Sequence, residues 1–228
     1  MANIKINISD NDLETLKKNK YKLCLAFREK SIGFDVVCIG TDQYFASNTF
    51  KVEDEYAVFF CNSLENGEVI DASSDVKNIE LGQRITVNEF GFFGSPVKGQ
   101  YSDRLEIVND YGSIYPGFGR KVKYGTDDSM RYAFVSPYAS VKGIFTMEPE
   151  NKIRVWFQQF AETGTYFTDF ISEKRMSGRS TYVDAFIDAS TGSDTVVLTY
   201  ENGKWQKKLN ICSGCRIKSE SNDVRLLN

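Results

Sequence analysis

The sequence predicts an all-β fold, namely an antiparallel β-sandwich of two sheets with one short helix near the N-terminus. Short segments of alternating polar and apolar residues fill most of the chain, and turn residues separate them. Aromatic residues make up 14% of the sequence, which favours strands over helices. No linker rich in proline and serine divides the 228 residues, so we expect residues 1–228 to form a single domain.

The first two predicted elements are a strand and the helix. Residues 2–8 alternate between polar and apolar side chains, as in a half-buried strand. Ser9 can then cap a helix whose first turn is acidic and whose last residues are basic, which predicts a helix over about residues 10–19. Its apolar side chains are Leu13 and Leu16, a face too narrow for a helix that inserts into a membrane.

Strands account for the other predicted elements. The clearest signal is a hairpin over residues 195–205, because Asn202-Gly203 tolerates the positive φ angles of a type I′ turn. Glycine and phenylalanine at residues 90–96 predict a sharp bend after one of the strands. The remaining predicted strands are residues 21–28, 34–39, 44–50, 55–61, 68–72, 81–88, 104–109, 130–135, 140–147, 152–160, 163–171 and 181–189.

Residues 109–125 form a long stretch that we expect to be an irregular loop. Several glycines and Pro116 disfavour a central strand there, while aromatic rings stand next to basic residues. Such a loop could present its rings to a sugar, a lipid headgroup or a partner protein, or it could pack back onto a sheet. The candidate contact residues are the rings of Tyr115, Phe118 and Tyr124 and the cations Arg120 and Lys123, together with Tyr138 and Trp156.

Trp156 is a candidate because it shares a strand face with polar neighbours. Ile153, Val155 and Phe157 occupy the other face of the same run. An exposed tryptophan would indicate a binding surface. The alternative is that a second layer covers this face too, as often happens in proteins built of two sheets.

The sequence contains no histidine, which narrows the possible chemistry. Serine–histidine and cysteine–histidine nucleophiles, an imidazole base and histidine-ligated metals are all excluded. Catalysis would depend on carboxylates, lysine, tyrosine or cysteine, so we expect neither an enzyme nor a cofactor or metal site. The net charge of −3, without a basic stretch, also argues against binding to nucleic acid.

The five cysteines do not indicate a disulfide framework. Cys24, Cys38 and Cys61 lie in apolar runs, where a free thiol behaves as a small apolar side chain. Cys212 and Cys215 have a spacing that occurs in metal and redox sites, but neither a second cysteine pair nor a βαβ pattern accompanies them. Whether these two cysteines pair with each other stays open.

The sequence also lacks targeting and membrane signals. The first residues have no apolar core of a signal peptide, and no later run approaches the ~20 apolar residues of a membrane-spanning helix. We expect a protein without a transmembrane segment, either cytoplasmic or released without a conventional signal peptide. The polar tail at about residues 219–228 is expected to be loose.

The segment Phe134-Val-Ser-Pro-Tyr138 is similar to part of the aromatic surface cluster of the sea-anemone cytolysins. These membrane-active toxins are compact β-sandwiches with a helix at the N-terminus, so the resemblance implies a protein that binds membrane lipid. It covers only these residues, and the amphipathic N-terminal helix that the cytolysins need is missing here.

The function that we predict is binding or self-assembly through surface contacts, without catalysis. The expected partner is the chain itself, in a homo-oligomer or a larger structural assembly. The alternatives are a monomeric lectin-like protein that binds a glycan and a cytolysin-like protein that binds a lipid headgroup. Exposed and clustered rings would support either alternative. The less favoured alternative is a glycosidase, which would hold two acids about 5–10 Å apart in a pocket.

Overall fold

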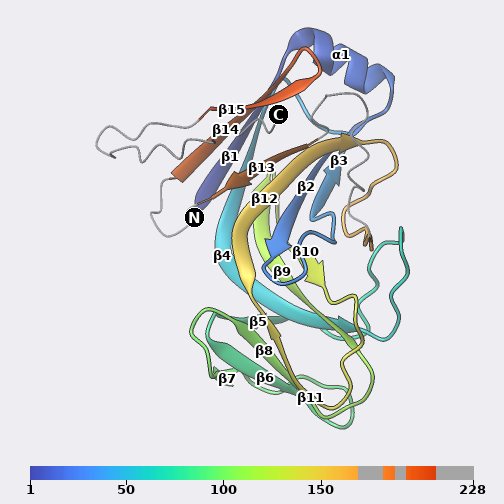
Figure 1. Cartoon of the computed structure of the whole chain (residues 1–228), viewed down its shortest axis with the longest axis vertical. Helices are drawn as coiled ribbons and strands as arrows, with labels where there is room; N and C mark the ends of the chain where they lie inside the picture. The colour runs from blue at the N-terminus through green and yellow to red at the C-terminus, as the bar shows by residue number, and fades with distance from the viewer. Residues whose placement is uncertain (169–181, 188–193, 209–228) are drawn as a thin grey trace, which may run out of the picture.

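The computed structural model describes residues 1–168, 182–187 and 194–208. This part of the chain is mostly β, with three sheets and one short helix (Figure 1). The expected all-β character is therefore confirmed. The strands are not all antiparallel, however, because β1 pairs with β14, and β6 with β8, in parallel.

The largest sheet has seven strands in the order β10-β9-β4-β1-β14-β15, with β5 paired to β4. In Figure 1, β4 curves along the length of the molecule, and its register against β9 shifts between Val52 and Tyr56. The strands of this sheet are β1 (Ala2–Ile8), β4 (Ser47–Cys61), β5 (Lys77–Ile79), β9 (Tyr115–Tyr124), β10 (Asp127–Val135), β14 (Asp194–Glu201) and β15 (Lys204–Lys208).

The two other sheets have four strands each. One is antiparallel in the order β13-β12-β2-β3, formed by β2 (Lys22–Glu29), β3 (Ile39–Thr41), β12 (Pro149–Gln158) and β13 (Tyr182–Phe186). The other, which we call the small sheet, has the order β11-β8-β6-β7 and consists of β6 (Gln83–Val87), β7 (Val97–Lys98), β8 (Leu105–Asn109) and β11 (Gly143–Met147). The small sheet lies at the bottom of Figure 1, at the end of the molecule opposite to the helix α1 (Asp10–Lys18).

Two local predictions are confirmed. Ser9 caps α1 by accepting a hydrogen bond from the backbone N–H of Asp12, and the helix ends at the cap residue Asn19. Asn202 and Gly203 have φ angles of 54° and 70°, as a type I′ turn requires, and they join β14 to β15. Asp12 Oδ1 accepts a hydrogen bond from the N–H of Gly203, so the first turn of the helix also holds the hairpin turn.

The main hydrophobic core draws buried side chains from all three sheets. Ile4 and Phe118 come from the largest sheet, Leu25 and Val155 from the antiparallel sheet, and Ile107 from the small sheet. Burial of these apolar side chains is the principal source of stability in a β protein of this kind. A second cluster covers the outer face of the antiparallel sheet, around Cys24, Ala26, Val37, Trp156 and Ala161.

The expectation of an irregular loop over residues 109–125 is wrong, because most of it forms the central strand β9. The predicted strands at residues 34–39, 68–72 and 163–171 are also wrong over their described parts, apart from Ile39. These segments make isolated bridges, Val36 with Tyr166 and Val69 with Thr165, and lie against the sheets as covering loops. The tail at residues 219–228, with Cys212 and Cys215, falls outside the described residues.

Candidate functional site

Several of the candidate contact residues lie in the interior. Phe118 packs in the core, Arg120 is 1% exposed, and Trp156 is covered by the second cluster. Tyr115, Lys123 and Tyr124 are partly buried along β9. Tyr138, in the connection from β10 to β11, is 73% exposed. The candidate residues therefore do not form one continuous surface in this conformation.

Arg120 holds the interior together as a buried cation. Its Nη2 donates to Asp54 Oδ1 at 2.7 Å and to Asn151 Oδ1 at 2.9 Å, and its Nε donates to the carbonyl oxygen of Glu53 at 3.2 Å. The guanidinium also lies over the rings of Phe27 and Tyr56, with its carbon 5.0 and 5.3 Å from the ring centroids. Since Asn151 belongs to β12 and Glu53 to β4, this side chain links two sheets.

The acidic triplet Glu53-Asp54-Glu55 is the partner of the basic pair Arg120-Lys121. The triplet coincides with the bulge in β4, and Lys121 Nζ lies 3.4 Å from Glu53 and 3.2 Å from Glu55. Hydrogen bonds to Glu55 and Glu53 raise the pKa of Lys121. Sequence reasoning missed this pairing, although three adjacent acids inside a strand pattern were a signal that the alternation breaks there.

Three loops meet at one end of the small sheet. Val87 at the end of β6 and Gly143 at the start of β11 both pair with Asn109 at the end of β8. The chain therefore leaves β6 and β8, and enters β11, at the same end of the small sheet. The buried Asn109 amide reaches the carbonyl oxygens of Gly112 and Ser140 at 2.6 and 3.0 Å. These bonds fix the loops over residues 110–114 and 136–142 against each other.

Exposed apolar side chains gather on these loops, and we call them the loop-end surface. The tip at residues 88–93 is held by Asn88, whose Oδ1 accepts hydrogen bonds from the N–H groups of Phe90 and Phe92. The Tyr111 ring lies against Gly91 in the same tip and 6.0 Å from the Phe60 ring. The exposed members of the loop-end surface are Phe90, Phe92, Tyr111, Tyr138 and Val141. Sequence reasoning identified Tyr138 alone, because pattern does not reveal which rings of an irregular segment face solvent.

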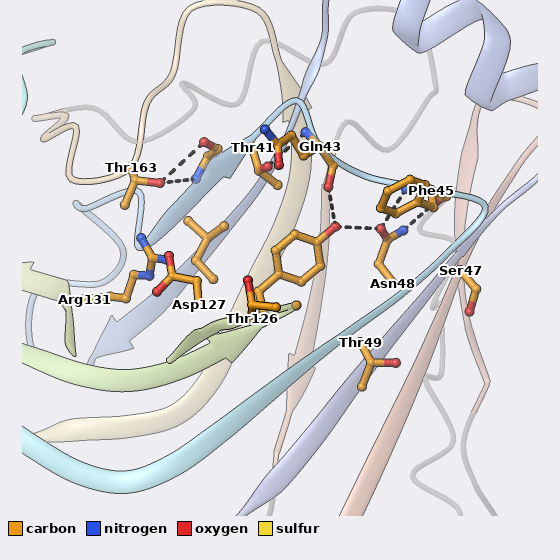
Figure 2. Close-up of a pocket in the computed structure, with 14 residues that line it drawn as sticks. Thr41, Gln43, Phe45, Ser47, Asn48, Thr49, Thr126, Asp127, Arg131 and Thr163 are labelled. Carbon is orange, nitrogen blue, oxygen red and sulfur yellow. Dashed lines mark hydrogen bonds and ion pairs between the residues drawn. The ribbon is translucent and has the colours of Figure 1, made fainter. Parts of the chain in front are cut away.

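A groove of about 680 Å³ lies on another part of the molecule, where Tyr124 ends β9. In Figure 2, Arg131 and Asp127 stand on one side of it and Phe45 and Asn48 on the other. The lining residues come from β3, the β3–β4 loop, the start of β4, the β9–β10 turn and the Thr163 loop. They are Ile39, Gly40, Thr41, Gln43, Phe45, Ser47, Asn48, Thr49, Tyr124, Gly125, Thr126, Asp127, Arg131 and Thr163.

Hydrogen bonds fix the wall of this groove. The Tyr124 hydroxyl lies 2.6 Å from the carbonyl oxygen of Gln43 and 2.9 Å from Asn48 Oδ1. Asn48 Oδ1 also accepts from the N–H of Phe45 at 2.9 Å, while its Nδ2 donates to the carbonyl of Phe45 at 2.7 Å. Opposite, Arg131 pairs with Asp127, and hydrogen bonds from Ser129 and the Arg131 charge lower the pKa of Asp127.

Asp35 is a buried carboxyl group in an unusual setting. Its two oxygens have no hydrogen-bond partner among the described residues, and burial raises its pKa well above that of a solvated aspartate. Nearby, burial and the Asp35 charge raise the pKa of Tyr166 to about 12. A carboxyl group with a raised pKa can hold a proton at neutral pH, but Asp35 does not line the groove beside Tyr124.

The described cysteines lack the features of reactive thiols. Cys24, Cys38 and Cys61 are free and buried, and burial raises the pKa of Cys24 and Cys38 to about 12 and that of Cys61 to about 11. Their expected role as small apolar side chains is confirmed.

Within the residues that the structure describes, no group of three or more histidine, cysteine, aspartate or glutamate side chains forms a possible metal site. The described part likewise holds no helix long and apolar enough to cross a membrane.

Comparisons with models of protein families, with curated proteins and with solved structures found no match to this chain.

Proposed function

We propose that this chain is a non-catalytic binding protein that associates with itself by pairing β11 with β11 of a second copy. The observation that carries the proposal is that β11 is an edge strand without charge. Its five residues, Gly-Ile-Phe-Thr-Met, pair with β8 on one side, and the other side has no strand partner among the described residues. An edge of this kind offers free N–H and C=O groups to another chain.

The other described edges are protected in ways that natural sheets commonly use. β15 carries Lys204, Lys207 and Lys208. β10 begins with two aspartates and also contains Arg131. β3 and β5 are three residues long and β7 is two, and β13 contains Asp184 in ion pairs with Arg154 and Lys152. β11 lacks each of these protections.

Exposed apolar side chains stand beside the β11 edge and would be covered by a second copy. Ile144 within the strand is 57% exposed, and Val141 and Tyr138 just before it are more exposed still. Antiparallel pairing across a two-fold axis would make one sheet of eight strands, four from each copy. Burial of this apolar area contributes roughly 25 cal/mol per Å² and adds to the backbone hydrogen bonds.

We also infer that the seven-stranded sheet and the antiparallel sheet pack face to face as a sandwich. The shared core cluster supports this packing, since it takes side chains such as Phe118 from one sheet and Leu25 from the other. The Arg120 contacts to β4 and β12 support it as well. In this arrangement the small sheet projects beyond the sandwich, which leaves the β11 edge accessible.

Light scattering coupled to size-exclusion chromatography tests the proposal. The wild-type chain should give a mass above that of the 25.9 kDa monomer, increasing with concentration. Ile144→Lys places a charge on the edge and should weaken association at least about tenfold, because pairing would bury an ammonium group. The matched control is Phe160→Lys, at a position that is 86% exposed and lies near the end of α1, where Gln159 bonds to Asn19.

Two results would contradict self-association through β11. One is a wild-type protein that stays monomeric at high concentration, and the other is an Ile144→Lys variant that associates as the wild type does. Flotation with vesicles of phosphatidylcholine, with and without phosphatidylserine, addresses the lipid alternative. Flotation of the wild type that is lost in a Phe90→Ser/Phe92→Ser variant would assign the loop-end surface to a membrane instead.

A further inference from the structure

The groove beside Tyr124 is a second surface that self-association does not use. Its volume of about 680 Å³ falls within the range of about 300–1,000 Å³ that is usual for small-molecule sites. Figure 2 shows polar side chains from several elements around the same space. None of these residues belongs to the small sheet or to its loops.

One wall of the groove presents an aromatic ring on a fixed backbone. Phe45 is 68% exposed, yet both its N–H and its carbonyl are bonded to the buried side chain of Asn48. The Tyr124 hydroxyl bonds to the same loop through Gln43 or Asn48. The ring is therefore exposed because the fold holds it outward, and a ligand would not have to order this backbone on binding.

Hydrogen-bonding groups that have no partner in the described chain line the rest of the groove. The side-chain amide of Gln43 and the hydroxyl of Thr126 are exposed and make no hydrogen bond within the described residues. Amides and hydroxyls can both donate and accept, which matches the hydroxyl groups of a sugar. The charges of Asp127 and Arg131 offset each other within the lining, which favours a neutral ligand over an ion. Lys17 Nζ lies 6.0 Å from the Phe45 ring centroid and donates to the carbonyl oxygen of Asp42.

We propose that this groove binds a neutral carbohydrate, with the face of one sugar ring stacked on Phe45. The apolar C–H face of the sugar would cover the exposed ring, and the sugar hydroxyls would bond to Gln43 and Thr126. The Asp127 carboxylate, which pairs with Arg131 and accepts from Ser129, lines the groove and can accept a further hydrogen bond from the ligand. The proposal goes beyond the proposed function, because it does not require a second copy of the chain.

A glycan array with the full-length chain, followed by titration of the strongest neutral oligosaccharide, tests this site. The wild type should bind a subset of neutral glycans, and Phe45→Ala should weaken that binding about tenfold or more through loss of the stacked ring. Thr126→Ala should weaken it by a smaller factor. Phe160→Ala removes a ring that is more exposed than Phe45 and lies outside the groove, and it should bind as the wild type does.

Phe45 and Thr126 are both exposed, so circular dichroism should show that the variants keep the wild-type fold. Titration with the free oligosaccharide and with the same glycan attached to a protein separates a soluble sugar from a glycoprotein as the source. Absence of any neutral glycan among the bound probes would overturn the proposal, as would binding that Phe45→Ala leaves unchanged. Neither result would bear on the β11 edge, because the tests of that edge do not involve the groove.

Discussion

Arg120 is the residue on which the interior depends most. The side chain donates to Asp54, Asn151 and a backbone carbonyl, and its Nη1 has no partner among the described residues. Arginine suits this position because its planar, forked guanidinium can reach several acceptors and stack on rings at once. Glycines and a lysine surround Arg120 in the sequence, and this context predicted a solvated loop and not a buried side chain.

Removal of the Arg120 side chain should destabilise the fold strongly. We expect Arg120→Ala to lower the free energy of unfolding by about 3 kcal/mol or more, since it leaves a large void and unpaired acceptors between two sheets. Urea denaturation followed by tryptophan fluorescence measures this change.

Asp54→Asn is the informative comparison for Arg120→Ala. The Asp54 side chain is 45% exposed, so solvent screens its part of the ion pair, and its loss should cost about 1 kcal/mol or less. Equal losses for the two variants would show that the ion pair, and not the buried arginine as a whole, stabilises the interior.

Asp35 should make the stability of the fold depend on pH. Burial raises the folded-state pKa of Asp35, so the unfolded chain gives up this proton at lower pH than the folded chain. The free energy of unfolding therefore falls as the pH rises above about 4, the usual range of an aspartate. Asp35→Asn removes this penalty and should raise the melting temperature at pH 7, with a gain that shrinks as the pH approaches 4.

Thermal unfolding between pH 4 and pH 8 checks this prediction. About 1 kcal/mol corresponds to about 2–4 °C for a chain of this size, so the shift is measurable. Asp75→Asn changes an exposed aspartate and should show no such pH-dependent gain. An Asp35→Asn gain that is constant across the range, or a loss at pH 7, would contradict a protonated buried Asp35.

At the scale of elements, β9 shows why glycine-rich sequence is ambiguous. A Cβ added to Gly117 would lie 2.5 Å from Phe59 Cζ and 2.6 Å from the carbonyl oxygen of Phe134. The glycine is needed because neighbouring strands approach closely at this point, which is one of the two common reasons for glycine in a strand. Glycine is also common in turns, so the sequence pattern did not distinguish a strand from a loop here.

Gly117→Ala should therefore damage the fold although it adds only a methyl group. We expect a loss of about 1–3 kcal/mol, from displacement of the Phe59 ring and of the β10 backbone. Gly112→Ala, in the same predicted loop, is the matched control, because its Cβ would meet nothing within 4 Å. Denaturation midpoints that change equally in the two variants would argue against close packing at Gly117.

Elements with strong local signals were predictable, and elements that depend on distant partners were not. The α1 cap at Ser9 and the Asn202-Gly203 turn are encoded within a few residues, so their positions agree with the structure. Residues 34–38 have strand-like composition but lie as a covering loop, because tertiary contacts override such weak preferences. Apart from Tyr138, the loop-end surface was not predicted, because the sequence pattern does not show which rings of an irregular segment face solvent.

At the scale of the whole molecule, the sheet order could not be read from the sequence. β1 pairs in parallel with β14, which begins at Asp194, close to the other end of the chain. Alternation of polar and apolar residues shows that a segment is a strand, but it does not show which strand lies beside it or in which direction. The same limit hid the pairing of β6 with β8, on which the meeting of the three loops depends.

This sheet order also leaves β11 as the edge at which we propose that another copy pairs. Chain connectivity places β11 outermost in the small sheet, away from the lysine-bearing edge of β15 and from α1. If this edge were only structural, a charged or shortened strand would protect it as the other edges are protected. We therefore regard association of two chains at β11 as the central claim about this molecule.

Amide hydrogen exchange, measured at low and high protein concentration, tests that claim most directly. Within Gly143–Met147, we predict that the amides that face away from β8 become more protected as the concentration rises, in step with the mass, and that Ile144→Lys abolishes the increase. Protection of these amides that does not change with concentration, while the protein stays at 25.9 kDa, would contradict pairing at β11.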